Sequence, residues 1–332
     1  MWTPPSQVLR RTPRQPPAPS LMAQHTSVIR GSRRAAPLTR SGRRFGALLA
    51  LPALVLVLGL IAVPAVQTLV YSLQDGTFVR AGSWNGFENF TKLFSSEKFR
   101  NSLWLTTVYA LGYLVLSTAL GLAFALLLNQ RFRGRWLARG LLIVPWAFPW
   151  VMVGIIWKWF VDGDVGVLRA LVVDTGLSDT FVAPLSTQNG AVVVAILAAA
   201  WRQSSLAALL FLAGLQSMPQ EIHEASLVDG AGIWQRFVHM TLAWLRPVVA
   251  VVVILSTISG FMQFDVIWAM TQGGPGNATT VLSIYLYQQL FVDTNLGLAS
   301  ATSVVLGILA LGLGFLSVKL MYRSNGVSEG VQ

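Results

Sequence analysis

Long runs of residues without a charged side chain limit what this chain can fold into. Six such runs cover residues 45–74, 101–130, 140–157, 190–218, 247–264 and 294–318, and a single charge, Arg202, interrupts the fourth. A helix needs roughly 20 apolar residues to cross about 30 Å of hydrocarbon. The chain is 54% hydrophobic and 11% charged, against about 25% charged in an ordinary soluble domain, which excludes a soluble globule. The runs predict an all-α integral membrane protein with six transmembrane helices.

Basic residues are distributed unevenly along the chain. Nine of its 24 lysines and arginines lie in the first 44 positions, which contain no acid, so the formal net charge of +11 falls to +2 without them. The basicity therefore belongs to one tail and does not indicate a nucleic-acid partner. If the N-terminus is cytoplasmic, 17 lysines and arginines flank the spans on the inside and six on the outside, as the positive-inside rule requires. We expect both termini to be cytoplasmic.

Composition divides the chain into three segments. Residues 1–44 are rich in arginine and proline and lack periodicity, which predicts a disordered cytoplasmic tail. A signal peptide is disfavoured because the apolar run that follows is longer than the usual core of about 7–15 residues, while an organelle transit peptide and a translation start at Met22 stay open. Residues 45–323 are predicted to form the transmembrane domain and residues 324–332 a C-terminal tail. The first tail is expected to hold the first span N-terminus-inside by attraction to anionic lipid.

The sequence contains no constellation of catalytic or metal-binding residues. It has no cysteine and its three histidines are scattered, so a metal site is not expected. A nucleophile, a base and an orienting acid do not recur at usable spacing, so we expect no enzyme activity. Asp162-Gly163-Asp164 hints at a calcium loop but lacks the closing glutamate. The glycine-rich run at 273–276 lacks the Gly-Lys-Ser/Thr of a phosphate-binding loop.

Several local features depart from plain spanning helices. Pro145 and Pro149 predict a kink in the third span. Residues 281–291 are too short an apolar run to cross, which predicts a short outer-face helix. The aromatic residues within 84–99 suit either a membrane interface or a surface loop with a small core. Arg202 lies within the fourth span, where it either faces the bundle interior as a functional group or pairs nearer the cytoplasmic side.

One polar segment, residues 219–247, separates the fourth and fifth spans on the predicted cytoplasmic side. Pro219 and the acidic Glu221 favour a helix start, since acids in the first turn are stabilised by the helix dipole. Gly230 then breaks this helix and Gly232 loosens the connection. An apolar stripe at helical spacing follows, formed by Trp234, Phe237, Val238 and Thr241. The pattern predicts a helix–glycine–helix elbow that lies across the membrane surface.

The same segment resembles the EAA loop of ATP-binding-cassette (ABC) importer permeases, in the form found in their carbohydrate-uptake branch. The residues that match this pattern at the expected spacing are Glu224, Ala225, Asp229, Gly230, Ala231, Phe237, Leu242 and Pro247. Ser226 stands where the family has a second alanine, and Ala243 stands where it has a proline. Residues 264–265 and 271–279 also resemble that branch, so the likeness extends over about residues 45–322.

This resemblance implies an ABC type I importer permease fold in the cytoplasmic membrane of a prokaryote. It implies that the chain is one of two homologous permease subunits, that two copies of an ABC ATPase dock on their loops, and that an external solute-binding protein delivers a sugar. ATP and Mg²⁺ would be bound by the ATPase, and this chain would hold no cofactor. The residues implied in ATPase coupling are Glu221, Glu224, Ala225, Asp229, Gly230, Ala231, Gly232 and Phe237.

Two alternatives stay open. A self-contained, ion-coupled secondary carrier would use Arg202 and Asp265 as coupling charges, but it would leave the cytoplasmic elbow unexplained. An ABC importer permease of this pattern could also carry glycerol 3-phosphate or another non-sugar solute. Because a sugar site needs buried hydrogen-bonding groups, the residues expected along the substrate pathway are Arg202, Gln203, Gln263 and Asp265.

Overall fold

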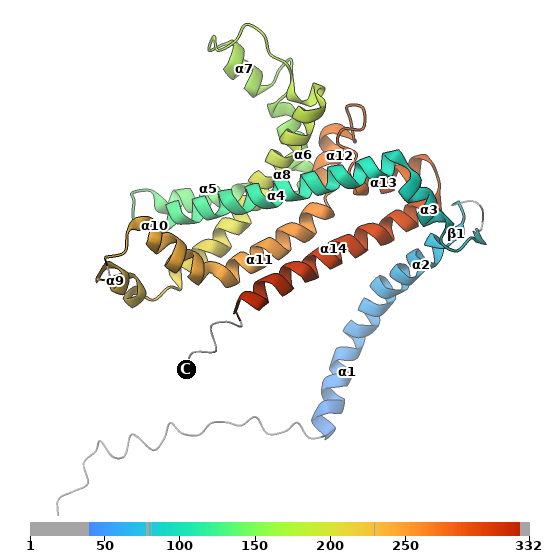
Figure 1. Cartoon of the computed structure of the whole chain (residues 1–332), viewed down its shortest axis with the longest axis horizontal. Coiled ribbons are helices and arrows are strands. Elements are labelled where there is room, and N and C mark those ends of the chain that lie inside the picture. Colours follow the sequence, from blue (N-terminus) through green and yellow to red (C-terminus); the bar gives the residue numbers. More distant parts are fainter. Residues whose placement is uncertain (1–39, 78–79, 81, 229, 326–332) are drawn as a thin grey trace, which may run out of the picture. The chain divides into compact units, whose positions relative to one another are not determined.

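The computed structural model describes residues 40–77, 80, 82–228 and 230–325 (Figure 1). Most of the two predicted tails, residues 1–39 and 326–332, lies outside this described part. The first helix begins at Arg40 and the last ends at Asn325, so each extends a few residues into a segment predicted to be a tail. Arginine is a good helix former, which agrees with the early start of the first helix.

The chain divides into two units, residues 1–62 and 63–332. The described part of the first unit consists of helix α1 (Arg40–Val57) and the π-helical turn η2 (Leu58–Ala62). Pro64 follows this turn, and a proline both lacks an N–H and crowds the carbonyl one turn earlier, so a wider turn relieves the crowding. Apolar side chains of the first unit, such as Leu58 and Leu60, are exposed, as expected of a helix that faces lipid or another membrane subunit.

Five helices of the described chain are long and apolar enough to cross a membrane, namely Leu51–Ser72, Glu97–Asn129, Gln188–Gln216, Ile233–Phe261 and Leu296–Lys319. They fall in α1 and α2 (Val63–Ser72), α4 (Glu97–Asn129), α8 (Gln188–Gln216), α10 to α11 (Leu242–Phe261) and α14 (Leu296–Asn325). A sixth candidate is α5 (Arg135–Ala147) followed by α6 (Trp150–Phe160), bent by 102° at the break between them. The predicted kink in the third span is therefore a sharp break, and the predicted six spans are all represented when α5 and α6 count as one.

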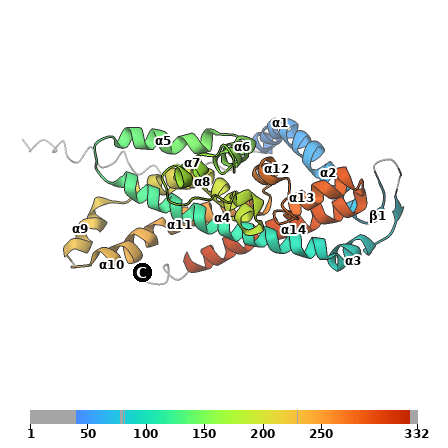
Figure 2. The ribbon, with the colours of Figure 1, turned by 90° about the horizontal axis from the view of Figure 1, so that it is seen from above.

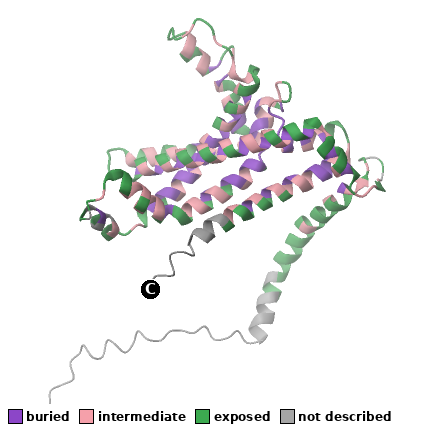
Figure 3. Cartoon of the chain, in the orientation of Figure 1, coloured by how far each residue is buried: buried purple, intermediate pink, exposed green. Residues whose placement is uncertain are grey.

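Helices α4, α8 and α11 form the centre of the second unit and pack against one another (Figures 1 and 2). Figure 3 shows buried residues along all three. Small side chains let these helices approach closely, as membrane helices often do. At one crossing, a Cβ added to Gly121 of α4 would lie 2.5 Å from the Cβ of Ala207 and 3.2 Å from the backbone nitrogen of Ala208 on α8. Only glycine fits at this point of α4.

Short elements join the spans. They are strands β1 (Gln74–Asp75) and β2 (Ser83–Trp84), helices α3 (Glu88–Ser95), α7 (Val167–Val173), α12 (Asp265–Thr271) and α13 (Leu282–Tyr287), the 3-10 turn η3 (Pro184–Ser186) and the π-helical turn η5 (Gln288–Val292). The short helix predicted at 281–291 is confirmed as α13 with η5. The small antiparallel ladder β1–β2 was not predicted.

The Asp162 carboxylate closes a local turn. It accepts hydrogen bonds from the backbone N–H groups of Asp164 and Val165, at 2.9 and 3.0 Å. These two bonds lower the pKa of Asp162 below its usual value, and the bond from Val165 has the larger effect. Within the described ranges no three His, Asp or Glu side chains gather where they could hold a metal ion. The Asp162-Gly163-Asp164 segment is thus a turn in the connection between α6 and α7.

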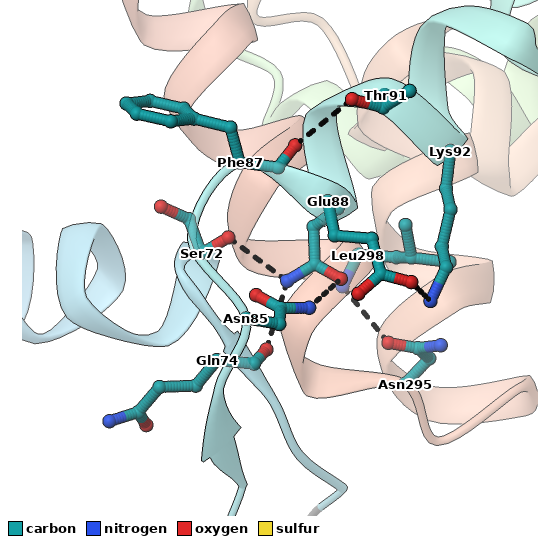
Figure 4. Close-up of polar contacts among 10 residues, drawn as sticks. Ser72, Gln74, Asn85, Phe87, Glu88, Thr91, Lys92, Asn295 and Leu298 are labelled. Atoms are coloured by element: carbon teal, nitrogen blue, oxygen red, sulfur yellow. Dashed lines mark hydrogen bonds and ion pairs between the residues drawn. The ribbon is translucent and has the colours of Figure 1, made fainter.

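A buried asparagine ties the end of α2 to α3. Asn89 is only 2% exposed, and its side-chain amide donates to the carbonyls of Ser72 and Gln74 at 3.0 and 2.9 Å. The side-chain amide of Asn85 donates in turn to the side-chain oxygen Oδ1 of Asn89 at 3.2 Å (Figure 4). The last carbonyls of a helix lack intrahelical partners, so Asn89 supplies the donor that α2 needs. Gly297 of α14 packs against the same Asn89 amide.

Replacing Asn89 should weaken this junction measurably. Asn89→Ala removes the donor for two carbonyls, and leaving buried polar groups without partners costs about 1–3 kcal/mol. We expect a lower midpoint of thermal unfolding for this variant. The midpoint is measured by fluorescence-detected size-exclusion chromatography of heated samples. Thr91→Ala is the matched control, because its hydroxyl bonds only to the Phe87 carbonyl on the exposed side of α3. Equal midpoints for the two variants would contradict the role given to Asn89.

Candidate functional site

The predicted elbow begins with an exposed helix. Helix α9 (Gln220–Val228) starts directly after Pro219, with Glu221 in its first turn. The Gln220 amide donates to the Glu224 carboxylate at 2.9 Å, and both side chains are exposed. No lysine or arginine pairs with Glu224 within the described part of the chain. The carboxylates of Glu221 and Glu224 are thus presented to the solvent.

A glycine ends this helix, as predicted. Gly230 has a φ of +68°, and the Ala231 N–H donates to the Ser226 carbonyl at 3.1 Å. A left-handed residue followed by this six-residue closure is the Schellman C-cap, which most often requires glycine. Asp229, the residue before Gly230, lies outside the described residues, and the side chain of Ala225 is likewise not described.

A second helix starts at once after the turn. The Gln235 side-chain carbonyl accepts from the Gly232 N–H at 3.0 Å, which satisfies one of the free donors at the start of α10 (Ile233–Arg236). The π-helical turn η4 (Phe237–Thr241) follows, and α11 continues from it. The predicted helix–glycine–helix elbow is therefore present, and its second arm is continuous with a membrane-crossing helix.

Apolar side chains are exposed at the tip of the elbow. Val228 is 88% exposed, Ile233 81% and Trp234 74%, whereas Phe237 is half-buried and packs on Trp234 at 5.6 Å between ring centroids. Trp234, the first residue of the apolar stripe expected from Trp234 to Thr241, is therefore exposed. Val228 and Ile233 were not predicted as site residues. Their signal in the sequence is that large apolar side chains flank the glycine turn of an otherwise polar segment.

The four residues expected along the substrate pathway are not joined to one another by hydrogen bonds or ion pairs. Gln203 on α8 and Gln263 between α11 and α12 are buried. The Gln263 backbone carbonyl accepts from the Ser283 hydroxyl. Asp265 begins α12 and is half-buried. Arg202 donates through Nε to the Phe148 carbonyl at 2.8 Å, and its guanidinium carbon lies 3.9 Å from the Trp150 ring centroid.

The described chain thus combines membrane-crossing helices with an exposed helix–turn–helix elbow between two of them, as a multi-pass membrane protein with a surface for a partner would. Residues 117–325 match the family described as "Binding-protein-dependent transport system inner membrane component". The chain belongs to this family. It is accordingly a multi-pass protein of the cytoplasmic membrane that acts as a transport component and is not an enzyme.

Individual relatives cover most of the chain. A probable ABC transporter permease of Brucella suis is 34% identical over 83% of this chain and 96% of its own. The trehalose/maltose transport system permease protein MalF of Thermococcus litoralis is 34% identical over 83% and 93%. The sulfoquinovosyl glycerol transport system permease protein SmoG of Agrobacterium fabrum is 35% identical over 81% and 88%. The recognition of an ABC importer permease from the sequence is confirmed.

A solved structure agrees on the fold. A chain in the crystal structure of a bacterial ABC transporter that imports the acidic polysaccharide alginate superposes with a TM-score of 0.74 at 22% identity. The superposition covers 85% of this chain and 96% of that chain. It confirms the predicted type I ABC importer permease fold.

Proposed function

We propose that this chain is one of two permease subunits of an ATP-driven sugar importer and that its elbow docks on a separate ATPase. The observation that carries the docking proposal is the elbow tip, where Val228, Ile233 and Trp234 are exposed beside two carboxylates that form no ion pair within the described part of the chain. Large exposed apolar side chains rimmed by polar residues are typical of a protein interface. The exposed Glu224 carboxylate is suited to a basic residue on the partner.

The solute and the remaining partners are proposed from the relatives. Permeases named for trehalose, maltose and sulfoquinovosyl glycerol support a sugar or a glycoside as the solute. A relative named for sn-glycerol 3-phosphate, 31% identical over 80% of this chain, supports that solute as the second candidate. An external solute-binding protein would deliver the solute, a second permease would complete the pathway, and the ATPase would bind ATP and Mg²⁺. The asymmetry of lysine and arginine supports placing the elbow and both termini in the cytoplasm.

The proposed solute contacts are Gln203, Gln263 and Asp265. The first two are buried amides within a membrane protein, and sugar hydroxyls need such donors and acceptors. Asp265, half-buried at the start of α12, adds an acceptor two residues after Gln263. Arg202 is set apart from this group because its guanidinium already has protein partners.

Affinity purification of the tagged chain from its native membrane in mild detergent tests the assembly. Mass spectrometry of the retained proteins should find an ABC ATPase and a second permease. Glu224→Arg should lose the ATPase and keep the second permease, because the reversed charge faces the basic partner expected there. Glu88→Arg is the matched charge reversal, since Glu88 is an exposed acid on α3 whose ion pair with Lys92 lies on the surface.

Two results would contradict the proposal. A chain that purifies alone and still takes up solute in vesicles without ATP would be a self-contained carrier. Retention of the ATPase by Glu224→Arg, at the level of the Glu88→Arg control, would remove Glu224 from the docking surface.

A further inference from the structure

Arg202 places a permanent charge at the centre of a membrane-crossing helix. It lies 14 residues from both Gln188 and Gln216, the two ends of α8. No acidic side chain pairs with it among the described residues, where the single ion pair joins Glu88 and Lys92. A cation at this depth is costly unless protein groups replace its hydration. The partners of Arg202 therefore have to be groups other than carboxylates.

The hydrogen-bond and ring partners of Arg202 lie on the two sides of the break between α5 and α6. The Nε–H of Arg202 donates to the carbonyl of Phe148, the residue directly after α5, at 2.8 Å. The guanidinium stacks on Trp150, the first residue of α6, at 3.9 Å from the ring centroid. A cation is favoured at the C-terminal end of a helix and over the face of a tryptophan. One side chain thus contacts both helices where they separate.

The break leaves a carbonyl that needs such a partner. Phe148 precedes Pro149, which disfavours a helical conformation at Phe148, and its ψ of 135° is extended. Because the chain turns by 102° here, the Phe148 carbonyl leaves the helical ladder within a membrane-crossing region. A backbone carbonyl without a donor is unfavourable there. Arg202 supplies the N–H donor for the Phe148 carbonyl that Pro149 and the next turn of the chain do not supply.

Packing of α6 against two other helices fixes the same geometry. Trp201, the residue before Arg202, contacts Trp157 of α6 edge to face, at 6.2 Å between centroids. One turn earlier on α6, a Cβ added to Gly154 would lie 2.7 Å from the Cβ of Ala269 and 2.8 Å from the Val266 carbonyl of α12. Helix α6 therefore packs against both α8 and α12, and Arg202 acts at its starting point.

We propose that Arg202 is a positioning residue that clamps the bend between α5 and α6, and not a ligand of the transported solute. The clamp stands on the geometry of Arg202, Phe148 and Trp150. Its kinetic consequence rests on the transport function proposed above. The Phe148 carbonyl and the Trp150 ring take up the Nε–H and one face of the guanidinium, so the fold sets the position of this group.

A distance measurement tests the bend directly. The chain has no cysteine, so Trp136→Cys and Trp159→Cys, at positions 78% and 58% exposed, give a unique pair of labelling sites in this chain, which is labelled before assembly with its partners. With the 102° bend, the two backbone positions lie about 22 Å apart, against about 35 Å for a straight helix at 1.5 Å per residue. Pulsed electron–electron double resonance should show one narrow distribution for the otherwise unchanged chain.

Arg202→Ala should broaden this distribution and move it to longer distances. Trp150→Ala should do so partly, and Trp150→Phe, which keeps a ring face, less still. Arg246→Ala is the matched control, because it removes an arginine from α11 without touching the bend. If Arg202→Ala does not accumulate, Arg202→Gln and the two Trp150 variants decide the question. An unchanged distribution in the variants that do accumulate overturns the clamp.

Uptake kinetics separate a positioning residue from a ligand. Arg202→Lys keeps the charge but loses the planar Nε–H donor, and we expect its maximal rate to fall about tenfold with an unchanged KM. Gln263→Ala, a proposed ligand, should instead raise KM. A tenfold rise in KM for Arg202→Lys with the bend intact would make Arg202 a ligand. If the unsubstituted complex shows no uptake, the transport proposal fails, while the distance measurement still decides on the clamp.

Discussion

Gly230→Val is expected to abolish ATP-dependent uptake while the chain still reaches the membrane. Gly230 has a φ of +68°, and a left-handed conformation costs about 1–2 kcal/mol for an ordinary residue and more for a β-branched one. A Cβ at this position would meet nothing within 4 Å, so the effect is conformational and not a clash. The C-cap of α9 should open and turn the exposed tip away from its partner.

Gly230→Asn is the control for this experiment. Asparagine tolerates the left-handed region better than other side chains, so this variant should retain most of the uptake. Immunoblots of the membrane fraction measure chain content, and uptake of labelled solute measures transport. Uptake by Gly230→Val equal to that of Gly230→Asn would show that the turn is not needed for coupling.

Gly121→Leu is expected to prevent accumulation of the folded chain. The added Cβ would lie 2.5 Å from the Ala207 Cβ and 3.2 Å from the Ala207 carbonyl carbon, so α4 and α8 would have to separate. Overpacking a core typically costs about 1–3 kcal/mol, and more where backbone atoms are the obstacle. The measurement is the yield and thermal midpoint of the detergent-solubilised chain by size-exclusion chromatography.

The same substitution on an open surface provides the comparison. Gly312 lies on α14, and a Cβ there would meet nothing within 4 Å. Gly312→Leu adds the same side chain to a membrane helix and should leave yield and midpoint unchanged. Comparable yields for Gly121→Leu and Gly312→Leu would mean that the α4–α8 crossing is looser than the structure indicates.

Features set by local chemistry could be predicted from the sequence. The lengths of the uncharged runs predicted the spans, because hydrocarbon thickness fixes how many apolar residues a crossing helix needs. Pro219 and Gly230 predicted the start and end of the first elbow helix, because each restricts its own backbone. The short helix at 281–291 followed from its length alone. These signals lie within a few residues of the structure they determine.

Features set by distant contacts could not be predicted. Pro145 and Pro149 indicated a kink, but the carbonyl at the 102° bend receives its hydrogen bond from Arg202, 54 residues away from Phe148. Gln74 of the β1–β2 ladder accepts a hydrogen bond from Asn89, which also bonds to Ser72, and both contacts cross a loop. Arg202 was expected on the substrate pathway because a charge in a membrane helix is usually functional. Its contacts in the fold were not visible in the spacing of residues.

The exposed tip of the elbow and Gln263, one of the proposed solute contacts, lie at opposite ends of one long helix. The helix from Ile233 to Phe261 has 29 residues, including the π-helical turn η4, which is about 43 Å at 1.5 Å per residue. Ile233 and Trp234 form part of the exposed tip at one end, and Gln263 lies two residues past the other. A rotation of about 10° at the docking end swings the far end through about 7 Å over that length. If the elbow docks on the ATPase as proposed, the helix can convert a slight rocking at the tip into a movement wider than a hexose ring at Gln263, with no relay of intermediate side chains.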